Sequence, residues 1–168
     1  MCYRRRMTPL SKGDRYAVAV NLWLCRPQPR NESLFDMKKP IKNSAEVEWE
    51  PAPAMFPKGA EIAILSGDLL NKERRYVFRL RMPKGYKLPA HNHPTRENVT
   101  ALSGNFHVGI GDQLDEKKGI QLTAGGYAQG PAKLNHYAWS SSPTVIQLDG
   151  DGPFAITYVN PADDPSKK

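Results

Sequence analysis

The sequence contains little cysteine and little histidine. Its two cysteines, Cys2 and Cys25, lie near the amino terminus at a spacing that fits no metal-ligand or redox motif, which excludes a cysteine-based site of known type. The two residues indicate nothing about the cell compartment. Histidine occurs only four times in 168 residues, but three of the four histidines lie at spacings that suit a metal site.

Long apolar runs are also missing. No stretch of about eighteen apolar residues occurs, so no membrane-spanning helix is predicted. Residues 17–25 form a short apolar stretch that Asn21 interrupts. The basic residues 4–6 precede it, but the charged Lys12 and Asp14 intervene, which does not match a secretory signal peptide. We therefore expect a cytoplasmic protein with no membrane partner.

The greater part of the chain lacks an excess of either charge. The net charge is +7, and residues 1–42 alone carry ten Lys and Arg against three acids. Residues 43–168 carry fourteen residues of each sign. A basic arm that contacts nucleic acid or an acidic membrane is one interpretation, but no aromatic interleaving supports it. The composition favours a solvated extension, so no nucleic-acid partner is expected.

Proline divides the chain into an arm and a domain. Seven prolines fall within the first 59 residues, where they interrupt helices and remove hydrogen-bond donors from any central strand. We predict a basic, partly irregular N-terminal arm over 1–59, with one edge strand at 16–24. A single β domain follows over 60–161, and a polar tail over 162–168.

Short apolar or alternating runs separated by turn residues fill the chain after residue 60, and no helical stripe of ten residues occurs. This pattern is typical of all-β sandwiches and barrels, and it predicts a jelly roll or closed barrel. The predicted strands are 61–65, 75–82, 98–102, 106–110, 120–122, 136–140, 145–148 and 154–159. The predicted turns include Ser103-Gly104 and residues 149–153, where Gly and Asn or Asp recur.

Alternation within one predicted strand indicates its inner face. Phe78, Leu80 and Met82 share one side and are expected to point inward. Arg79 and Arg81 share the other side, and they are expected to face solvent rather than to bind a carboxylate.

The histidines supply the candidate chemistry. His91 and His93 are two residues apart, so on an extended chain both imidazoles leave the same face and can reach one ion. Glu97 follows a proline that breaks the strand and lets the carboxylate return to that side. His136 would complete the set from a facing strand. The alternative is that two strand histidines are simply solvated or hydrogen-bonded.

Three imidazoles and one carboxylate suit one divalent transition metal, namely Fe, Mn, Ni, Cu or Zn. Calcium and magnesium would need more oxygen ligands. An octahedral ion on four protein ligands keeps two positions open for water, dioxygen or a chelating substrate. A tetrahedral zinc would be closed and structural.

The residues around these ligands resemble a known signature. Gly85, five residues, His91, one residue, His93, three residues, Glu97, six residues and Gly104 reproduce without a gap the first motif of the cupin superfamily. The chain thus resembles a small single-domain bacterial metal-binding cupin. The resemblance implies a double-stranded β-helix, or jelly-roll barrel.

The second cupin motif is matched less closely, by Gly125, Pro131, Lys133, His136 and Ser140. Lys133 stands where the family usually has glycine, and Ser140 stands where it usually has asparagine. We therefore expect a differently shaped turn before His136 and altered support for the site.

The two motifs together imply the ligand set. By resemblance His91, His93, Glu97 and His136 hold the metal. The alternative is a degenerate cupin with an empty pocket.

Several further side chains are candidates near the pocket. If Ser103-Gly104 forms a two-residue hairpin, Thr100 pairs with His107, and His107 points away from the metal. Because side chains alternate along a strand, the residues on the opposite face from His107 are expected in the pocket wall: Phe106, Val108 and Ile110. Three aromatic residues are candidate rim or substrate contacts, with plain packing as the alternative: Tyr86, Tyr127 and Trp139.

Two functions from different classes remain open. The first is a dioxygenase-like metalloenzyme that acts on a small oxygenated substrate. The second is a metal-dependent sensing or binding module similar to cupin-type regulator and anti-sigma domains. An enzyme should show a substrate-sized cavity beside an open metal site, whereas a sensor should show a closed zinc site.

No catalytic residue beyond the ligands is predicted. A homodimer is expected, because the family commonly dimerises and sheet edges pair readily.

Overall fold

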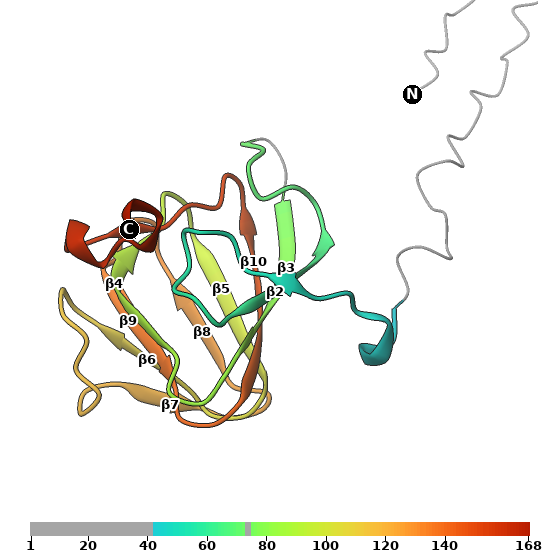
Figure 1. The fold of residues 1–168 in the computed structure, drawn as a ribbon, viewed down its shortest axis with the longest axis horizontal. Coiled ribbons are helices and arrows are strands. Elements are labelled where there is room, and N and C mark those ends of the chain that lie inside the picture. The colour runs from blue at the N-terminus through green and yellow to red at the C-terminus, as the bar shows by residue number, and fades with distance from the viewer. Residues whose placement is uncertain (1–41, 73–74) are drawn as a thin grey trace, which may run out of the picture. The chain divides into compact units, whose positions relative to one another are not determined.

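Two antiparallel β-sheets form the described part of the chain, which in this computed structural model covers residues 42–72 and 75–168 (Figure 1). The predicted strand at 16–24 and the two cysteines lie outside these residues. Among the described residues, none of the helices has the length and apolar character needed to cross a membrane. The helices present are three short 3-10 turns: η2 (Ser44–Glu46), η3 (Pro161–Asp163) and η4 (Pro165–Lys167).

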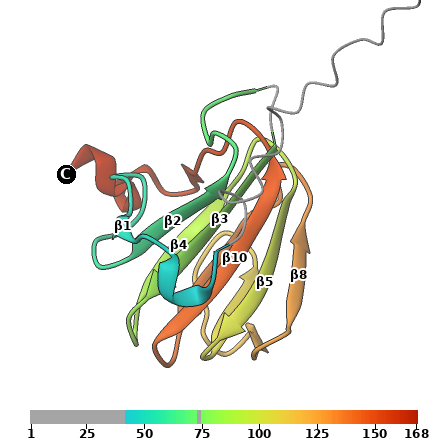
Figure 2. The same ribbon diagram turned by 90° about the vertical axis from the view of Figure 1, so that its right-hand side faces the viewer.

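The six-stranded sheet, called sheet A, is seen face on in Figure 2. Its strands, in spatial order, are β1 (Glu50–Pro51), β2 (Glu61–Ser66), β3 (Arg75–Met82), β10 (Thr144–Asp151), β5 (Glu97–Ser103) and β8 (Tyr127–Gly130). The five-stranded sheet, called sheet B, contains, in spatial order, β11 (Thr157–Tyr158), β4 (Lys87–Asn92), β9 (His136–Ser140), β6 (Phe106–Ile110) and β7 (Ile120–Leu122). The predicted all-β jelly-roll class is confirmed.

The apolar core lies between the sheets. Phe78, Leu80 and Met82 on β3 are buried as predicted, and Tyr76 continues the same face. Further core residues come from several other strands: Ile62, Val99, Phe106, Ala138, Ile146 and Leu148. Burial of these side chains from both sheets is the main force that holds the sheets together.

The outward arginines of β3 have partners on sheet A. Arg81 Nε donates to Glu61 Oε2 at 2.7 Å, and its guanidinium lies 4.6 Å from the ring centroid of Trp49. Arg79 Nε donates to Gln147 Oε1 at 3.2 Å. Arg81 is exposed as expected, but it does pair with a carboxylate. Such an exposed pair adds little stability.

The predicted hairpin at Ser103-Gly104 is wrong. β5 belongs to sheet A and β6 to sheet B, so the turn carries the chain from one sheet to the other. Gly104 has φ +77, and a Cβ there would lie 2.2 Å from the carbonyl oxygen of Pro143. Only glycine fits this crossing without displacing backbone.

The predicted turn at 149–153 is wrong in its first half, because β10 continues to Asp151. Gly150 lies within the strand, where a Cβ would meet the Tyr76 hydroxyl at 2.5 Å. This glycine therefore serves close packing rather than a turn.

Candidate metal centre

Sheet B supplies three histidines to one point between the sheets. His91 on β4 pairs directly with His136 on the neighbouring strand β9. His93 follows the end of β4 and lies on the same side as His91, as the two-residue spacing predicts. Their ligand nitrogens all lie within 4.8 Å of one another. His136 therefore comes from the adjacent strand of the same sheet and not from a facing strand, which corrects that expectation.

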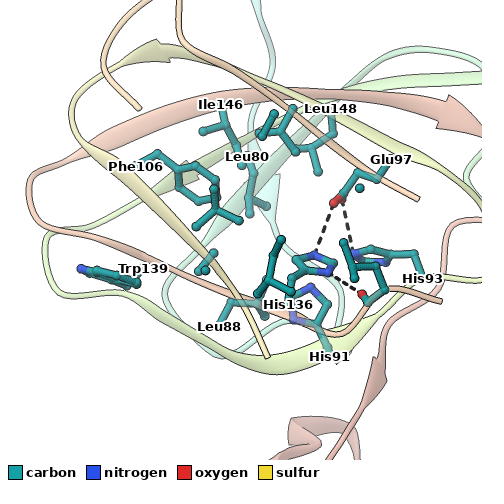
Figure 3. Close-up of a pocket in the computed structure, with 18 of the residues that line it drawn as sticks. Leu80, Leu88, His91, His93, Glu97, Phe106, His136, Trp139, Ile146 and Leu148 are labelled. Atoms are coloured by element: carbon teal, nitrogen blue, oxygen red, sulfur yellow. Dashed lines mark hydrogen bonds and ion pairs between the residues drawn. The ribbon is translucent and has the colours of Figure 1, made fainter. Parts of the chain in front are cut away.

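The facing sheet contributes Glu97, the first residue of β5 (Figure 3). Its Oε1 lies 3.4 Å from His93 Nε2, and its Oε2 lies 3.6 Å from His136 Nε2. Ligand atoms that share one transition-metal ion lie roughly 3 to 4 Å apart, so both distances fit a common ion. The ligand role of Glu97 itself stays a prediction.

Backbone carbonyls fix how each imidazole is turned. The Nδ1 atoms of His91, His93 and His136 lie 2.7, 2.8 and 2.9 Å from the carbonyl oxygens of Pro89, Ala155 and Leu134, in that order. A carbonyl only accepts, so each Nδ1 must carry the hydrogen. In the neutral ring the Nε2 lone pair is then free, and it points toward the other ligands.

One of these nitrogens has no hydrogen-bond partner. His93 Nε2 is buried and unsatisfied, because its contact with Glu97 lacks hydrogen-bond geometry. The residue is only 4% exposed. Burying a lone pair without a hydrogen-bond partner costs free energy, and a bound metal ion would remove that cost by accepting the lone pair. The residues present therefore fit a divalent metal ion.

Burial and mutual proximity set the protonation of the group. Burial, with smaller contributions from His136 and His93, lowers the pKa of His91 to about 3, so this ring is neutral. Burial on its own would raise the pKa of the Glu97 carboxyl group. The neighbouring histidines outweigh burial, with His93 contributing most, so that the pKa of Glu97 is lowered. For His136, burial on its own would lower the pKa, but the Glu97 carboxylate outweighs burial, so that the pKa of His136 is raised. A metal needs the neutral ring, so at His136 it would compete with a proton.

The turn before His136 contains the residue that departs from the cupin pattern. Lys133 has φ +66, the one positive φ among the described non-glycine residues. Its N–H donates to the carbonyl of His93 at 2.9 Å, which ties this turn to the other histidine segment. Lys133 thus adopts the left-handed conformation in which glycine is favoured, while the expectation of a differently shaped turn stays a prediction.

Ser140 supports the site from the far end of β9. It is fully buried, and its Oγ donates to the carbonyl of Pro83 at 2.6 Å. Its backbone N–H and carbonyl also bond to Tyr86 and Gly85. The serine thereby anchors the turn from which β4, the strand of His91, begins.

A cavity of about 380 Å³ adjoins the histidines. Figure 3 shows Leu80, Phe106 and Ile146 in its wall, away from the cluster of His91, His93 and His136. Other apolar wall residues are Met82, Leu88, Val99, Val108, Ala138, Leu148 and Phe154. This is a normal size for a small-molecule site, and its wall is predominantly apolar.

The fourth histidine lies on the outer side of sheet B. His107 faces away from the cavity, as expected, although it pairs with Trp139 and Gln121 rather than with Thr100. Its ring stacks on Trp139 at 4.7 Å, and its Nε2 lies 2.9 Å from Ser141 Oγ.

Most, but not all, of the predicted wall and rim residues line the cavity. Phe106, Val108 and Ile110 line the cavity as predicted. Tyr86 also lines the cavity, but its hydroxyl donates to the carbonyl of Pro57. Tyr127 lies outside, on sheet A, where it bonds to Asn98.

Sequence reasoning missed two contributors to the site. Phe154 stacks on the His93 ring with centroids 5.1 Å apart, and the carbonyl of the following Ala155 orients the same ring. The missed strand β8 places Ala128 and Gly130 in the cavity wall. The Gly-rich and proline-flanked sequence around β8 carries no strong strand signal.

No protein-family model matches the sequence, and no curated protein matches it. Solved structures do match. The polyketide cyclase RemF from Streptomyces resistomycificus aligns with a TM-score of 0.61 and 14% identity, over 76% of this chain and 89% of the cyclase.

Two further structures agree with that match. A putative acetylacetone dioxygenase from Methylibium petroleiphilum aligns with a TM-score of 0.55 and 20% identity, over 74% of this chain and 86% of that one. An RmlC-like cupin from Shewanella frigidimarina aligns with a TM-score of 0.51 and 20% identity, over 67% and 90% of the two chains. The chain therefore has the cupin jelly-roll fold, with a buried histidine triad that can hold a metal.

Proposed function

We propose that this protein is a metal-dependent enzyme of the oxygenase type, in which His91, His93, Glu97 and His136 hold one divalent transition metal. The observation that carries the proposal is the unsatisfied Nε2 of His93 at the edge of a substrate-sized apolar cavity. A purely structural zinc site would need no such cavity.

The chain's own residues bind and orient. A bound metal would supply Lewis-acid or one-electron chemistry at positions that the four side chains leave open. The carbonyls of Pro89, Ala155 and Leu134 hold the imidazoles in place, and the apolar wall excludes water from the reacting end.

Hydrolysis by paired carboxylates has no support. Of the described residues that line the cavity, Glu97 is the one carboxylate, and it faces the histidines. An acid–base pair of carboxylates would need a second one. Metal-centred oxidation or rearrangement needs fewer additional groups, in keeping with the dioxygenase and cyclase activities named for two structures of the same fold.

The test is oxygen consumption by protein loaded separately with iron(II), manganese(II), nickel(II) and copper(II). The substrates are enolisable 1,3-diketones, including acetylacetone, and substituted catechols. We expect uptake with at least one metal and compound, and a loss of at least about a hundredfold in His136→Ala. His107→Ala is the matched control, because this histidine faces away from the cavity, and it should keep the activity.

One result would instead support the sensing module. Tightly held stoichiometric zinc, with no oxygen uptake or substrate conversion under any metal, would contradict the enzyme proposal.

A further inference from the structure

The polar side chains around the cavity are unevenly placed. Beyond the proposed ligands, the lining residues with polar side chains are Tyr86, Lys118 and Gln129, together with the indole of Trp139. Tyr86 bonds to a backbone carbonyl, Lys118 pairs with Asp115 at 3.4 Å, and Gln129 bonds to Asn98. The ring of Trp139 stacks on His107 on the outer side of sheet B.

A bound molecule therefore meets a mostly apolar wall, with the histidine cluster at one end and with Lys118, exposed and paired with Asp115, as the one charged side chain among the described lining residues beyond the proposed ligands. A polar group along its body would lose its water without finding a partner, which is unfavourable. The cavity favours an apolar body that carries its oxygen atoms at one end.

Small residues open one side of this cavity. β8 is an edge strand of sheet A, and its inward residues are Ala128 and Gly130. Gly130 pairs with Glu97, so it lies beside the proposed ligand set. A Cβ at Gly130 would meet no atom within 4 Å, which means that the space there is open rather than filled by packing.

Exposed apolar side chains line the same cavity from sheet B. Ile110 is 72% exposed and pairs with His136, and Ile120 is 69% exposed on the edge strand β7. Large apolar residues so exposed at the rim of a cavity are typical of a ligand entry. The small residues on β8 and the isoleucines on β6 and β7 thus line one and the same cavity.

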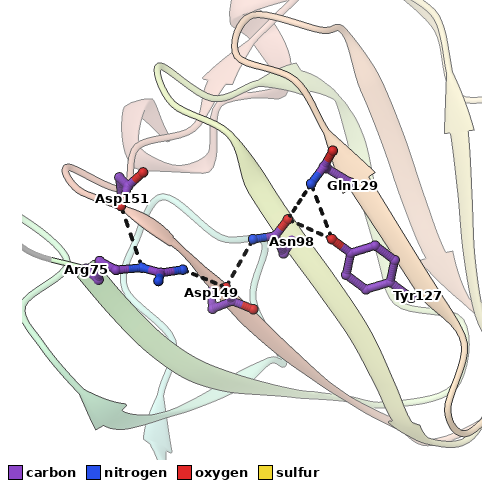
Figure 4. A network of polar contacts seen from close by, with 6 residues as sticks. All are labelled: Arg75, Asn98, Tyr127, Gln129, Asp149 and Asp151. Atoms are coloured by element: carbon purple, nitrogen blue, oxygen red, sulfur yellow. Dashed lines mark hydrogen bonds and ion pairs between the residues drawn. The ribbon is translucent and has the colours of Figure 1, made fainter.

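β8 is held firmly on its outer side. Tyr127 and Gln129 both donate to Asn98 Oδ1, at 2.9 and 3.1 Å, and Asn98 donates to Asp149 at 3.0 Å (Figure 4). The network fixes the edge strand to β5 and β10. The free space at Gly130 is therefore a defined feature of the wall and does not depend on movement of the strand.

We infer that Gly130 and Ala128 determine specificity, because they leave room beside the metal for the apolar body of a substrate whose oxygen atoms lie at one end. The inference rests on the proposed metal site. Through that site it rests on the buried, unpartnered Nε2 of His93 that faces the same cavity, and its own support is the open space beside Gly130.

Hydroxamates test the inference, because they chelate divalent metals through two oxygens while the attached group is varied. Cobalt(II)-loaded protein is titrated calorimetrically with acetohydroxamate and benzohydroxamate. The wild type should bind benzohydroxamate at least about tenfold more tightly, since the ring enters apolar surroundings. Gly130→Val should remove most of this preference and leave cobalt affinity unchanged. Valine is compatible with an edge strand, and Ala128→Val is the second variant in case the first does not fold.

The matched control is Ala124→Val, which makes the same change as Ala128→Val at an exposed position outside the cavity, and it should keep the preference. If cobalt binds but the wild type shows no preference, or if Gly130→Val and Ala128→Val both keep it, the specificity assignment is wrong while the metal site stands. If cobalt does not bind at all, the proposed function fails and the inference fails with it.

Discussion

A hydrogen bond to a backbone carbonyl orients each of the three histidines at the candidate site. The carbonyl belongs to the residue two positions before His91 and His136, and for His93 it is that of Ala155, in the segment before β11. Two further residues support the segments that carry these histidines. They are Lys133 and Ser140, the positions where the second cupin motif departs from the usual pattern, and each can be tested by a single substitution.

Ser140→Ala should destabilise the protein by about 1 to 3 kcal/mol, because the buried carbonyl of Pro83 loses its donor. Urea denaturation measures the change. Ser141→Ala, at the exposed neighbouring position, loses only an exposed contact with His107 and should change the free energy of unfolding by less than about 0.5 kcal/mol. Equal effects in the two variants would show that the Pro83 contact contributes nothing.

Lys133→Gly should stabilise the protein by about 0.5 to 1 kcal/mol, because glycine adopts the observed positive φ without steric cost. Lys133→Ala is the control, since it removes the same side chain but keeps the backbone cost. The free energy of unfolding should rise in the glycine variant and not in the alanine variant. A rise in both would assign the effect to the lysine side chain instead.

At the scale of strands, local spacing predicted most of sheet A and the histidine cluster, but not the shape of the pocket. The spacing of His91, His93 and Glu97 is short, so an extended chain and one break largely determine where the side chains point. β4 was not predicted because Pro89 lies inside it. The register of β4 on β9 shifts between Leu88 and His91, and proline is tolerated at such an irregularity.

The pocket wall depends on pairings between distant segments. β8 has four residues and no apolar alternation, so nothing local identifies it as a strand. It becomes one because β5 pairs with it and Asn98 holds its outer side chains. The predicted strand at 154–159 shortened to Thr157–Tyr158 for a related reason, since Phe154 packs into the core and stacks on His93.

Asn98→Ala should loosen β8 and lower the free energy of unfolding by about 1 to 2 kcal/mol, because hydrogen bonds to Tyr127, Gln129 and Asp149 are lost. Amide hydrogen exchange should be faster in β8. Arg75→Ala, at the exposed end of the same network, should leave β8 exchange unchanged. Unchanged exchange in Asn98→Ala would show that backbone pairing alone holds the strand.

At the scale of the whole molecule, the described chain is a cupin jelly roll in which one pocket combines the candidate ligands and the apolar wall. The predicted homodimer, the cytoplasmic location and the predicted division into arm, barrel and tail stay predictions. Because the candidate ligands come from both sheets, with His91 and His136 on β4 and β9 of sheet B and Glu97 on β5 of sheet A, a bound metal should stabilise the whole fold.

Metal removal should therefore lower the melting temperature. A ligand that binds only the folded state contributes about 2.7 kcal/mol when present at a hundred times its dissociation constant. Chelator treatment followed by dialysis should lower the melting temperature by several degrees, and adding back the metal should restore it. A melting temperature that responds to neither step would mean that no metal links the two sheets.

The most direct measurement of the central claim is the metal content of the purified protein, with no metal supplied beyond the growth medium. We predict close to one transition-metal ion per chain in the wild type and in His107→Ala, and a large loss in His136→Ala and Glu97→Ala. If the wild type holds no metal, or if the last two variants hold as much as the wild type, the four-ligand site is wrong.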